Sequence, residues 1–173
     1  GRYINLPESL RVIRQYGGVY LKKNSASDRE NAASTEKKVS AGLREMSMEL
    51  PVPGILESPF GVFESKIFSY KKQKIEEKKY TKWFDYDKIK NSPCVRTRRQ
   101  GDYLTVNSEG GRKKLNRIFI DEKIPAEMRD RLPVVAVGSE ILWIPGGRMN
   151  EKYKITSTTG RVLELHYQGG VLT

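Results

Sequence analysis

Apolar residues recur at every second position in short runs along most of the chain, and proline or glycine interrupts nearly every run. This spacing places alternate side chains on the same face of a β-strand. The runs within residues 3 to 22 predict a strand followed by a hairpin that turns at Gly17-Gly18. Residues 62 to 70 and 161 to 167 predict two further strands, the second of which closes the fold.

The period changes from two to about 3.6 after Arg112, as expected of an α-helix. Leu115, Ile118 and Phe119 share one face of this predicted helix, and the basic residues between 113 and 117 share the opposite face. A second short helix is predicted from Pro125, because proline is favoured in the first turn of a helix.

A hairpin follows the helices, with strands at residues 134 to 137 and 141 to 144 around Gly138-Ser139. Both strands are apolar on both faces, so we expect them to be buried. Together these patterns predict an α+β protein with many short strands in mixed or antiparallel sheets and a small helical insertion in the second half.

Two segments are predicted along the chain. Residues 1–90 form a β-rich segment that includes a mobile loop at 24–48, because that loop has no repeating apolar face to bury. Residues 91–173 form an α+β domain that binds nucleic acid. The boundary signal near residues 90 to 93 is weak, and one continuous domain is the alternative.

The net charge of +11 favours a polyanionic partner. Nucleic acid is the first candidate, an anionic membrane surface the second, and a merely solubilising charge the third. No apolar run approaches the roughly 18 residues that span a bilayer, so we expect no membrane association through a spanning helix. Cys94 is the only cysteine, which excludes an internal disulfide and favours a cytoplasmic protein.

Basic residues cluster around one glycine-rich stretch, "SEGGRKK", in the second half of the chain. A positively charged strand and a helix N-terminus would place cationic side chains and free amides near phosphates. A second basic group follows in "GRMNEKYK". The candidate nucleic-acid-binding residues are Arg96, Arg98, Arg99, Arg112, Lys113, Lys114, Arg117, Arg148, Lys152 and Lys154. Two unrelated solvated faces remain the alternative reading of these charges.

No catalytic, cofactor or metal site emerges from the residues. The "SEGGRKK" loop lacks the spacing of a nucleotide-binding loop and of a dinucleotide fingerprint. His166 has no serine or cysteine motif to serve, so a packed or solvated histidine is expected. Asp85 and Asp87 are predicted on one face of a strand, where such a pair could hold a metal, although such pairs are common on surfaces.

Several ordered blocks closely resemble the carboxy-terminal region of bacterial tRNA(Ile)-lysidine synthetases. These blocks are "YTKWFDYDKIKNSPCVRTRRQGDYL", "GGRKKLNRIFIDEKIPAEMRDRLPVV" and "ILWIPGGRMNEKYKIT", and the leading "GRYINLPESLRVIRQYGGVYL" is similar to the segment that opens the same region. The resemblance covers nearly the whole chain except the 24–48 loop.

The resemblance implies a tRNA-binding accessory region. In this family an amino-terminal domain with an SGGxDS-like motif uses ATP, with Mg, and lysine to convert the wobble cytidine of an isoleucine tRNA to lysidine. That motif does not occur in this sequence, so the chain alone is expected to bind no cofactor and to have no ligase activity. The implied partners are isoleucine tRNA and the amino-terminal catalytic domain, and a homodimer is a further option. The alternative function is a structural or dimerisation module without tRNA contact.

Overall fold

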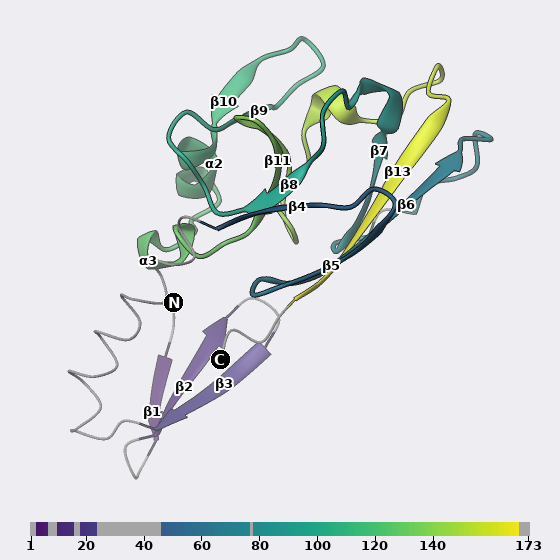
Figure 1. Ribbon diagram of the computed structural model, residues 1–173. Helices are drawn as coiled ribbons and strands as arrows, with labels where there is room; N and C mark the ends of the chain where they lie inside the picture. Colours follow the sequence, from purple (N-terminus) through teal and green to yellow (C-terminus); the bar gives the residue numbers. More distant parts are fainter. Residues whose placement is uncertain (1–2, 7–9, 16–17, 24–45, 77, 170–173) are drawn as a thin grey trace. The chain divides into compact units, whose positions relative to one another are not determined.

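The computed structural model describes residues 3–6, 10–15, 18–23, 46–76 and 78–169 (Figure 1). The chain forms two compact units, Gly1–Gly42 and Leu43–Thr173. Each unit is described by itself below.

The first unit contains a three-stranded antiparallel sheet. Its strands are β1 (Tyr3–Leu6), β2 (Leu10–Gln15) and β3 (Gly18–Lys23), in the order β1-β2-β3. Ile4 pairs with Val12, and Val12 pairs with Leu21, so these three positions lie in register across the sheet. This arrangement confirms the predicted strand and hairpin. Most of the predicted loop at 24–48 lies outside the described residues, but its last positions begin a strand, β4 (Ser47–Glu49).

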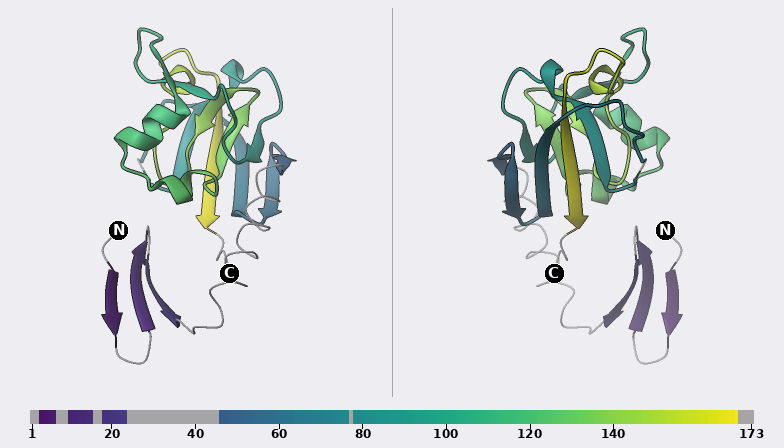
Figure 2. Two further views of the ribbon diagram at one scale, coloured as in Figure 1. Left: turned by 90° about the vertical axis from the view of Figure 1, so that its left-hand side faces the viewer. Right: turned by 90° about the vertical axis from the view of Figure 1, so that its right-hand side faces the viewer.

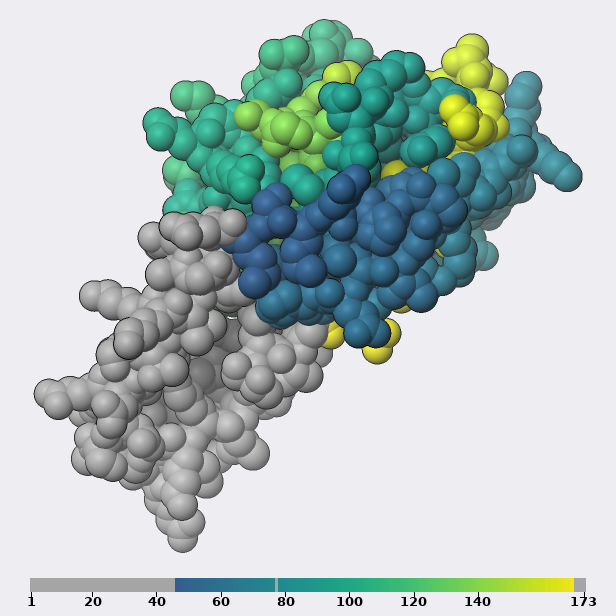
Figure 3. Space-filling view, viewed as in Figure 1, coloured from purple at the N-terminus to yellow at the C-terminus, as the bar shows by residue number. Residues whose placement is uncertain are grey.

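A four-stranded antiparallel sheet forms one layer of the second unit. Its order is β5-β6-β13-β7, with β5 (Gly54–Ser58), β6 (Gly61–Ser69), β7 (Thr81–Asp85) and β13 (Arg161–Gly169). The predicted closing strand is β13, which pairs with both β6 and β7 and therefore occupies the interior of the sheet. The blue segment that contains β4, β5 and β6 covers much of the near face of this unit in Figure 3.

A six-stranded mixed sheet forms the second layer, in the order β10-β9-β12-β11-β8-β4. The strands not yet introduced are β8 (Cys94–Arg96), β9 (Tyr103–Thr105), β10 (Arg112–Lys114), β11 (Val134–Val137) and β12 (Glu140–Trp143). All pairings are antiparallel except that of β12 with β9. The hairpin predicted around Gly138-Ser139 is the β11–β12 pair at the centre of this sheet.

Two short α-helices form the third layer, α2 (Leu115–Asp121) and α3 (Ala126–Arg129). Figure 2 shows them together at one side of the strands. Two 3-10 helices, η1 (Tyr86–Lys88) and η2 (Glu151–Tyr153), follow β7 and β12. The predicted α+β class, with mixed and antiparallel sheets and a small helical insertion, is confirmed. Within the described ranges, no helix is long and apolar enough to cross a membrane.

Alternating side chains on β11 join the three layers. Val135 packs with Phe63 and Leu163 between the two sheets, whereas Val134 and Ala136 pack with Phe119 of α2 on the opposite face. The central strands β11 and β12 are therefore buried on both faces, as their apolar residues predict.

The compact units divide the chain between Gly42 and Leu43, whereas the sequence predicts a boundary near residues 90 to 93. The reason is a shared core. Phe63 and Phe84, which precede residue 90, are fully buried in the same cluster as Val95, which follows it. A division near residue 90 would split this cluster.

The β11–β12 turn provides a test of backbone conformation alone. Gly138 has a φ of 60°, and an added Cβ would meet no atom within 4 Å. Gly138→Ala should therefore destabilise the second unit by about 1–2 kcal/mol through the left-handed backbone alone. Gly169→Ala in β13 is the matched control, because its nearest atom would lie at 3.6 Å and its φ is ordinary. Urea unfolding followed by tryptophan fluorescence measures the free energy of unfolding of both variants. Equal stability of the two variants would contradict the argument.

Candidate nucleic-acid interface

Arg96 is a buried structural residue, although the sequence places it among the candidates for phosphate contact. Its side chain is 2% exposed and that of Asp102 is 1% exposed. The guanidinium donates from both terminal nitrogens to the two Asp102 oxygens, each at 2.8 Å. It also donates to the carbonyls of Thr97 at 2.9 Å and Gly138 at 2.7 Å. This network connects β8 to the β11–β12 turn and leaves Arg96 without access to a phosphate.

Opposing effects act on the ionisation of Arg96. Burial is the largest single effect and acts to lower the pKa of its guanidinium, whereas the hydrogen bonds and charge of Asp102, together with a contribution from Cys94, act to raise it. The pKa of Arg96 therefore lies above its usual value, and the arginine stays charged inside the protein. The backbone N–H of Arg99 also donates to Asp102, at 2.7 Å.

Arg98 is held partly in place by the helical layer. Its Nε donates to Asp130 Oδ1 at 2.8 Å, and one terminal nitrogen donates to Asn116 Oδ1 at 2.8 Å. The side chain is 30% exposed, so it lies at the edge of the surface with its charge balanced by Asp130.

The basic stretch before α2 is a strand, whereas the sequence predicts that it starts the helix. Lys113 and Lys114 belong to β10, where they pair with Leu104 and Tyr103 of β9. The helix begins only at Leu115. The reason is that β10 forms a hairpin with β9, in which Arg112 pairs with Thr105. Its three residues run directly into α2, so in the sequence they fit the first turn of that helix equally well. The predicted burial of Leu115, Ile118 and Phe119 on one helical face is confirmed.

Because β10 is a strand, its basic residues point to two different faces. Arg112 and Lys114 share a face with Tyr103, and the Arg112 guanidinium lies 4.8 Å from the centre of the Tyr103 ring. Arg99 is exposed in the loop after β8. Within the part of the chain that the structure describes, these three cations form no ion pair with a carboxylate. We call Arg99, Arg112 and Lys114 the unpaired trio.

Three other candidate cations lie on the helical side and pair with acids. Lys113 and Arg117 both bind Asp121, at 2.5 and 3.2 Å, and Arg148 lies 3.7 Å from Glu122. The hydrogen bond from Lys113 is the main cause that lowers the pKa of Asp121. We call Lys113, Arg117 and Arg148 the ion-paired trio, because each charge already has a carboxylate partner.

The last two candidates belong to η2 and its C-cap, and they too have acidic partners. Lys152 binds Glu140 at 2.8 Å, and this hydrogen bond is the main cause that raises the pKa of Lys152. Lys154 binds Glu151 at 2.8 Å. Glu140 pairs with Tyr103 on the neighbouring strand, so Lys152 lies close to the face that carries Arg112 and Lys114.

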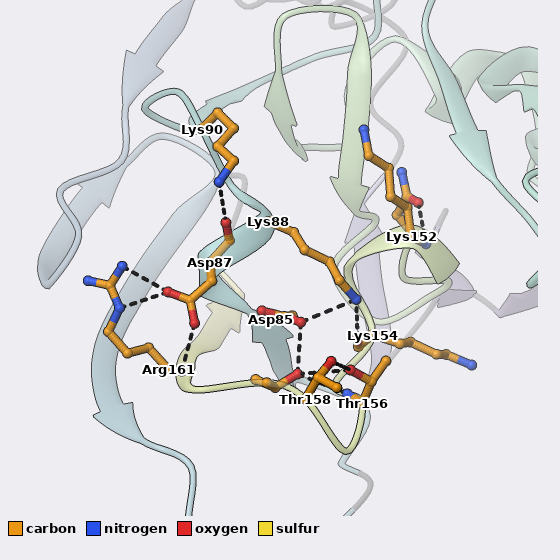
Figure 4. Close-up of polar contacts among 11 residues, drawn as sticks. Asp85, Asp87, Lys88, Lys90, Lys152, Lys154, Thr156, Thr158 and Arg161 are labelled. Atoms are coloured by element: carbon orange, nitrogen blue, oxygen red, sulfur yellow. Dashed lines mark hydrogen bonds and ion pairs between the residues drawn. The ribbon is translucent and has the colours of Figure 1, made fainter.

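Asp85 and Asp87 do not share a strand face, because Asp87 lies in η1 (Figure 4). Asp85 is buried and accepts from Thr159 Oγ1 at 2.8 Å and from Lys88 Nζ at 3.2 Å. Asp87 binds Arg161, whose backbone N–H is the main cause that lowers the pKa of Asp87. The two carboxylates thus bind different partners and do not form the pair on one strand face that the sequence predicts.

His166 and two aromatic residues of β7, Trp83 and Phe84, also have structural roles. His166 is exposed, with Nδ1 2.8 Å from Thr81 Oγ1. Phe84 is fully buried, and the Trp83 indole donates to Glu164 at 2.6 Å. Tyr103 is the aromatic residue beside the unpaired trio. The sequence could have indicated it, because Tyr103 lies just before the basic glycine-rich loop. Among the described residues, no cluster of three or more His, Cys, Asp or Glu could hold a metal.

The chain is similar to known proteins of one family. Residues 94–165 match the family described as "TilS substrate C-terminal domain". The chain is 35% identical to a tRNA(Ile)-lysidine synthase of Caldanaerobacter subterraneus subsp. tengcongensis over 95% of its length, and 33% identical to one of Geobacillus kaustophilus over 95%. It covers 32% and 33% of those relatives, so it spans about a third of their length.

A solved structure agrees with the sequence comparisons. The structure described as "Crystal structure of TILS C-terminal domain" is 33% identical to this chain and superposes with a TM-score of 0.61. The match covers 72% of this chain and 96% of that structure. The shared fold therefore includes nearly all of the solved domain.

Proposed function

The chain belongs to the TilS C-terminal domain family, and from that premise we propose that it is the tRNA-contacting accessory region of a tRNA(Ile)-lysidine synthase. The whole enzyme would use ATP, with Mg, and lysine to convert the wobble cytidine of an isoleucine tRNA to lysidine. The catalytic domain of the longer protein would bind ATP and carry the ligase chemistry, and this region would contribute no catalytic residue. Its partners would be isoleucine tRNA and that catalytic domain, in the cytoplasm.

The observation that carries the tRNA contact is the unpaired trio. Arg99, Arg112 and Lys114 are exposed without carboxylate partners in the described part of the chain, inside the region that matches the family. An A-form RNA stem is recognised mainly through its shape, phosphates and 2′-hydroxyls, and arginine and lysine suit those groups. The Arg112 guanidinium lies over the Tyr103 ring, on the same strand face as Lys114. Both cations could therefore contact neighbouring phosphates of one RNA strand.

A remote contact of this kind assists catalysis by positioning. Binding energy from a part of the substrate far from the reacting base can select the correct tRNA and orient it in the active site. The ion-paired cations are poorer candidates, because a phosphate must compete with a carboxylate that is already bound.

Binding of isoleucine tRNA at several salt concentrations tests the proposal. Fluorescence anisotropy of a labelled transcript should show binding at low salt, with a log affinity that falls linearly against log salt. Three phosphate contacts from the unpaired trio alone predict a slope of about −3. The chain alone should attach no radiolabelled lysine to the transcript.

The absence of detectable tRNA binding at low salt would overturn the proposal. The chain would then be the structural or dimerisation module that is the alternative within the same enzyme. Sedimentation of the chain alone would measure that alternative directly, because a dimer without tRNA affinity would support it.

A further inference from the structure

A lysine-rich connection between β6 and β7 takes no part in the proposed interface. Residues 71 to 82 contain six lysines and two glutamates. The five lysines before β7 are all exposed, namely Lys71, Lys72, Lys74, Lys78 and Lys79. Lys78 binds Glu76 at 3.2 Å, but both side chains are more than half exposed, so this pair neutralises little charge.

Both ends of this connection are attached to the sheets. At its start the Tyr70 N–H donates to the Gly160 carbonyl at 2.8 Å, and at its end the Tyr80 carbonyl accepts from the Tyr167 N–H at 2.8 Å. The Tyr80 ring packs so closely on Gly146 that an added Cβ there would lie 2.8 Å from it. The lysines are thus presented from a segment whose two ends are fixed.

A pocket of about 210 Å³ lies between this connection, β7 and the segment around η2. Ile75, Trp83, Met149 and Ile155 provide apolar walls, and Lys82 and Lys154 provide positive charge. The pocket is smaller than the roughly 300–1,000 Å³ typical of sites for drug-sized ligands, so it suits a smaller group.

Trp83 is held firmly at this pocket. Its indole N–H donates to Glu164 at 2.6 Å, and Phe68 meets its ring edge-on with centroids 5.0 Å apart. An aromatic ring with a fixed orientation loses little entropy when a second flat ring binds beside it. Aromatic rings that alternate with lysines are typical of sites for single-stranded nucleic acid.

We propose that this pocket holds the base of one unpaired nucleotide of the bound RNA, with Lys82 and the other lysines of the connection on its neighbouring phosphates. A base has flat apolar faces, which match the Trp83 ring, and polar edges, which match the Glu76 side chain. A base within a stem is stacked and paired on all sides, so only an unpaired nucleotide can enter. This inference rests on the proposed function and adds a single-stranded element to the RNA that the chain recognises.

Tryptophan fluorescence tests the base contact. The chain has two tryptophans, and Trp143 is fully buried, so Trp83 is the one that a base can quench. A short single-stranded RNA should quench the emission, whereas a blunt-ended RNA duplex of the same composition should not. Trp83→Phe should abolish the quenching. Equal quenching by both RNAs, or none by the single strand while it is bound, would overturn the inference.

A pair of double variants tests the phosphate contacts. Lys79→Gln with Lys82→Gln should flatten the salt slope for the single-stranded RNA by up to about 1.4 units, at about 0.7 units per phosphate. Lys90→Gln with Lys123→Gln removes the same charge from exposed positions that do not line the pocket and should leave the slope unchanged. If tRNA binds but the two double variants give the same salt slope for the single-stranded RNA, only this inference fails. If no RNA binds at all, the proposed function fails with it.

Discussion

Asp102→Ala should lower the free energy of unfolding of the second unit by about 3–5 kcal/mol, because it leaves the Arg96 charge buried without its partner. Arg96 is 2% exposed and loses two hydrogen bonds of 2.8 Å in this variant. The Arg99 N–H loses its acceptor as well. Urea unfolding followed by tryptophan fluorescence measures the effect, because Trp83 and Trp143 both belong to the Leu43–Thr173 unit.

Asp121→Ala is the matched control for this prediction. It is the same substitution in an ion pair, but Asp121 binds Lys113 and Arg117 at the surface, with its own side chain 35% exposed. Exposed pairs contribute about 0–1 kcal/mol, so this variant should remain close to the wild type. Equal losses in the two variants would mean that the buried pair has no special role.

The double variant Arg96→Met with Asp102→Leu separates the cost of an unpaired charge from the value of the pair. Replacing a buried ion pair with apolar residues of similar volume is often neutral or stabilising. The double variant should therefore recover part of the stability that Asp102→Ala loses. The Arg99 N–H would still lack its acceptor, which leaves a deficit of about 1–3 kcal/mol.

Arg96 shows why charge in a sequence does not identify a surface. The alternation around β8 correctly predicts a strand, but it cannot reveal which face of that strand is covered. Asp102 reaches back to Arg96 through a turn in which its N–H donates to the Arg99 carbonyl and Gly101 has a φ of 91°. The available signal was the Gly-Asp pair that follows the arginines after Gln100, because glycine and aspartate are typical of tight turns.

The elements that could be predicted are those whose burial is periodic over several residues. The strands β11, β12 and β13 are such cases, since apolar side chains occupy one or both of their faces. The strand β4 spans three residues and is held by its partner β8, more than forty positions away, so no local pattern could reveal it. The strand β10 is a different case: its partner β9 ends only seven positions before it, but the three residues of β10 fit a helix equally well and run directly into α2.

The division between strand and helix at Lys114 and Leu115 matters most for the interface. On a continuous helix, Lys113, Lys114 and Arg117 would present one basic face. On a strand, Lys114 turns toward Tyr103, while Lys113 turns toward the helical layer and its acid, Asp121. The structure thus separates candidates that the sequence groups together, and it replaces one basic face with two faces that differ in how their charge is balanced.

Changing the unpaired trio to glutamine should flatten the salt slope of tRNA binding by up to about three units, one for each duplex phosphate that a side chain contacts. Arg99, Arg112 and Lys114 are exposed, so glutamine at each position should leave the fold intact. Changing the ion-paired trio, Lys113, Arg117 and Arg148, removes the same formal charge but also releases Asp121 and Glu122 from their partners. Because those cations are already neutralised, their loss should flatten the slope by less than half as much.

Anisotropy titrations with isoleucine tRNA across a salt series compare the two triple variants directly, and urea unfolding verifies that both are folded. An equal or larger effect of the ion-paired trio would place the RNA on the helical side and would reject the strand face as the interface.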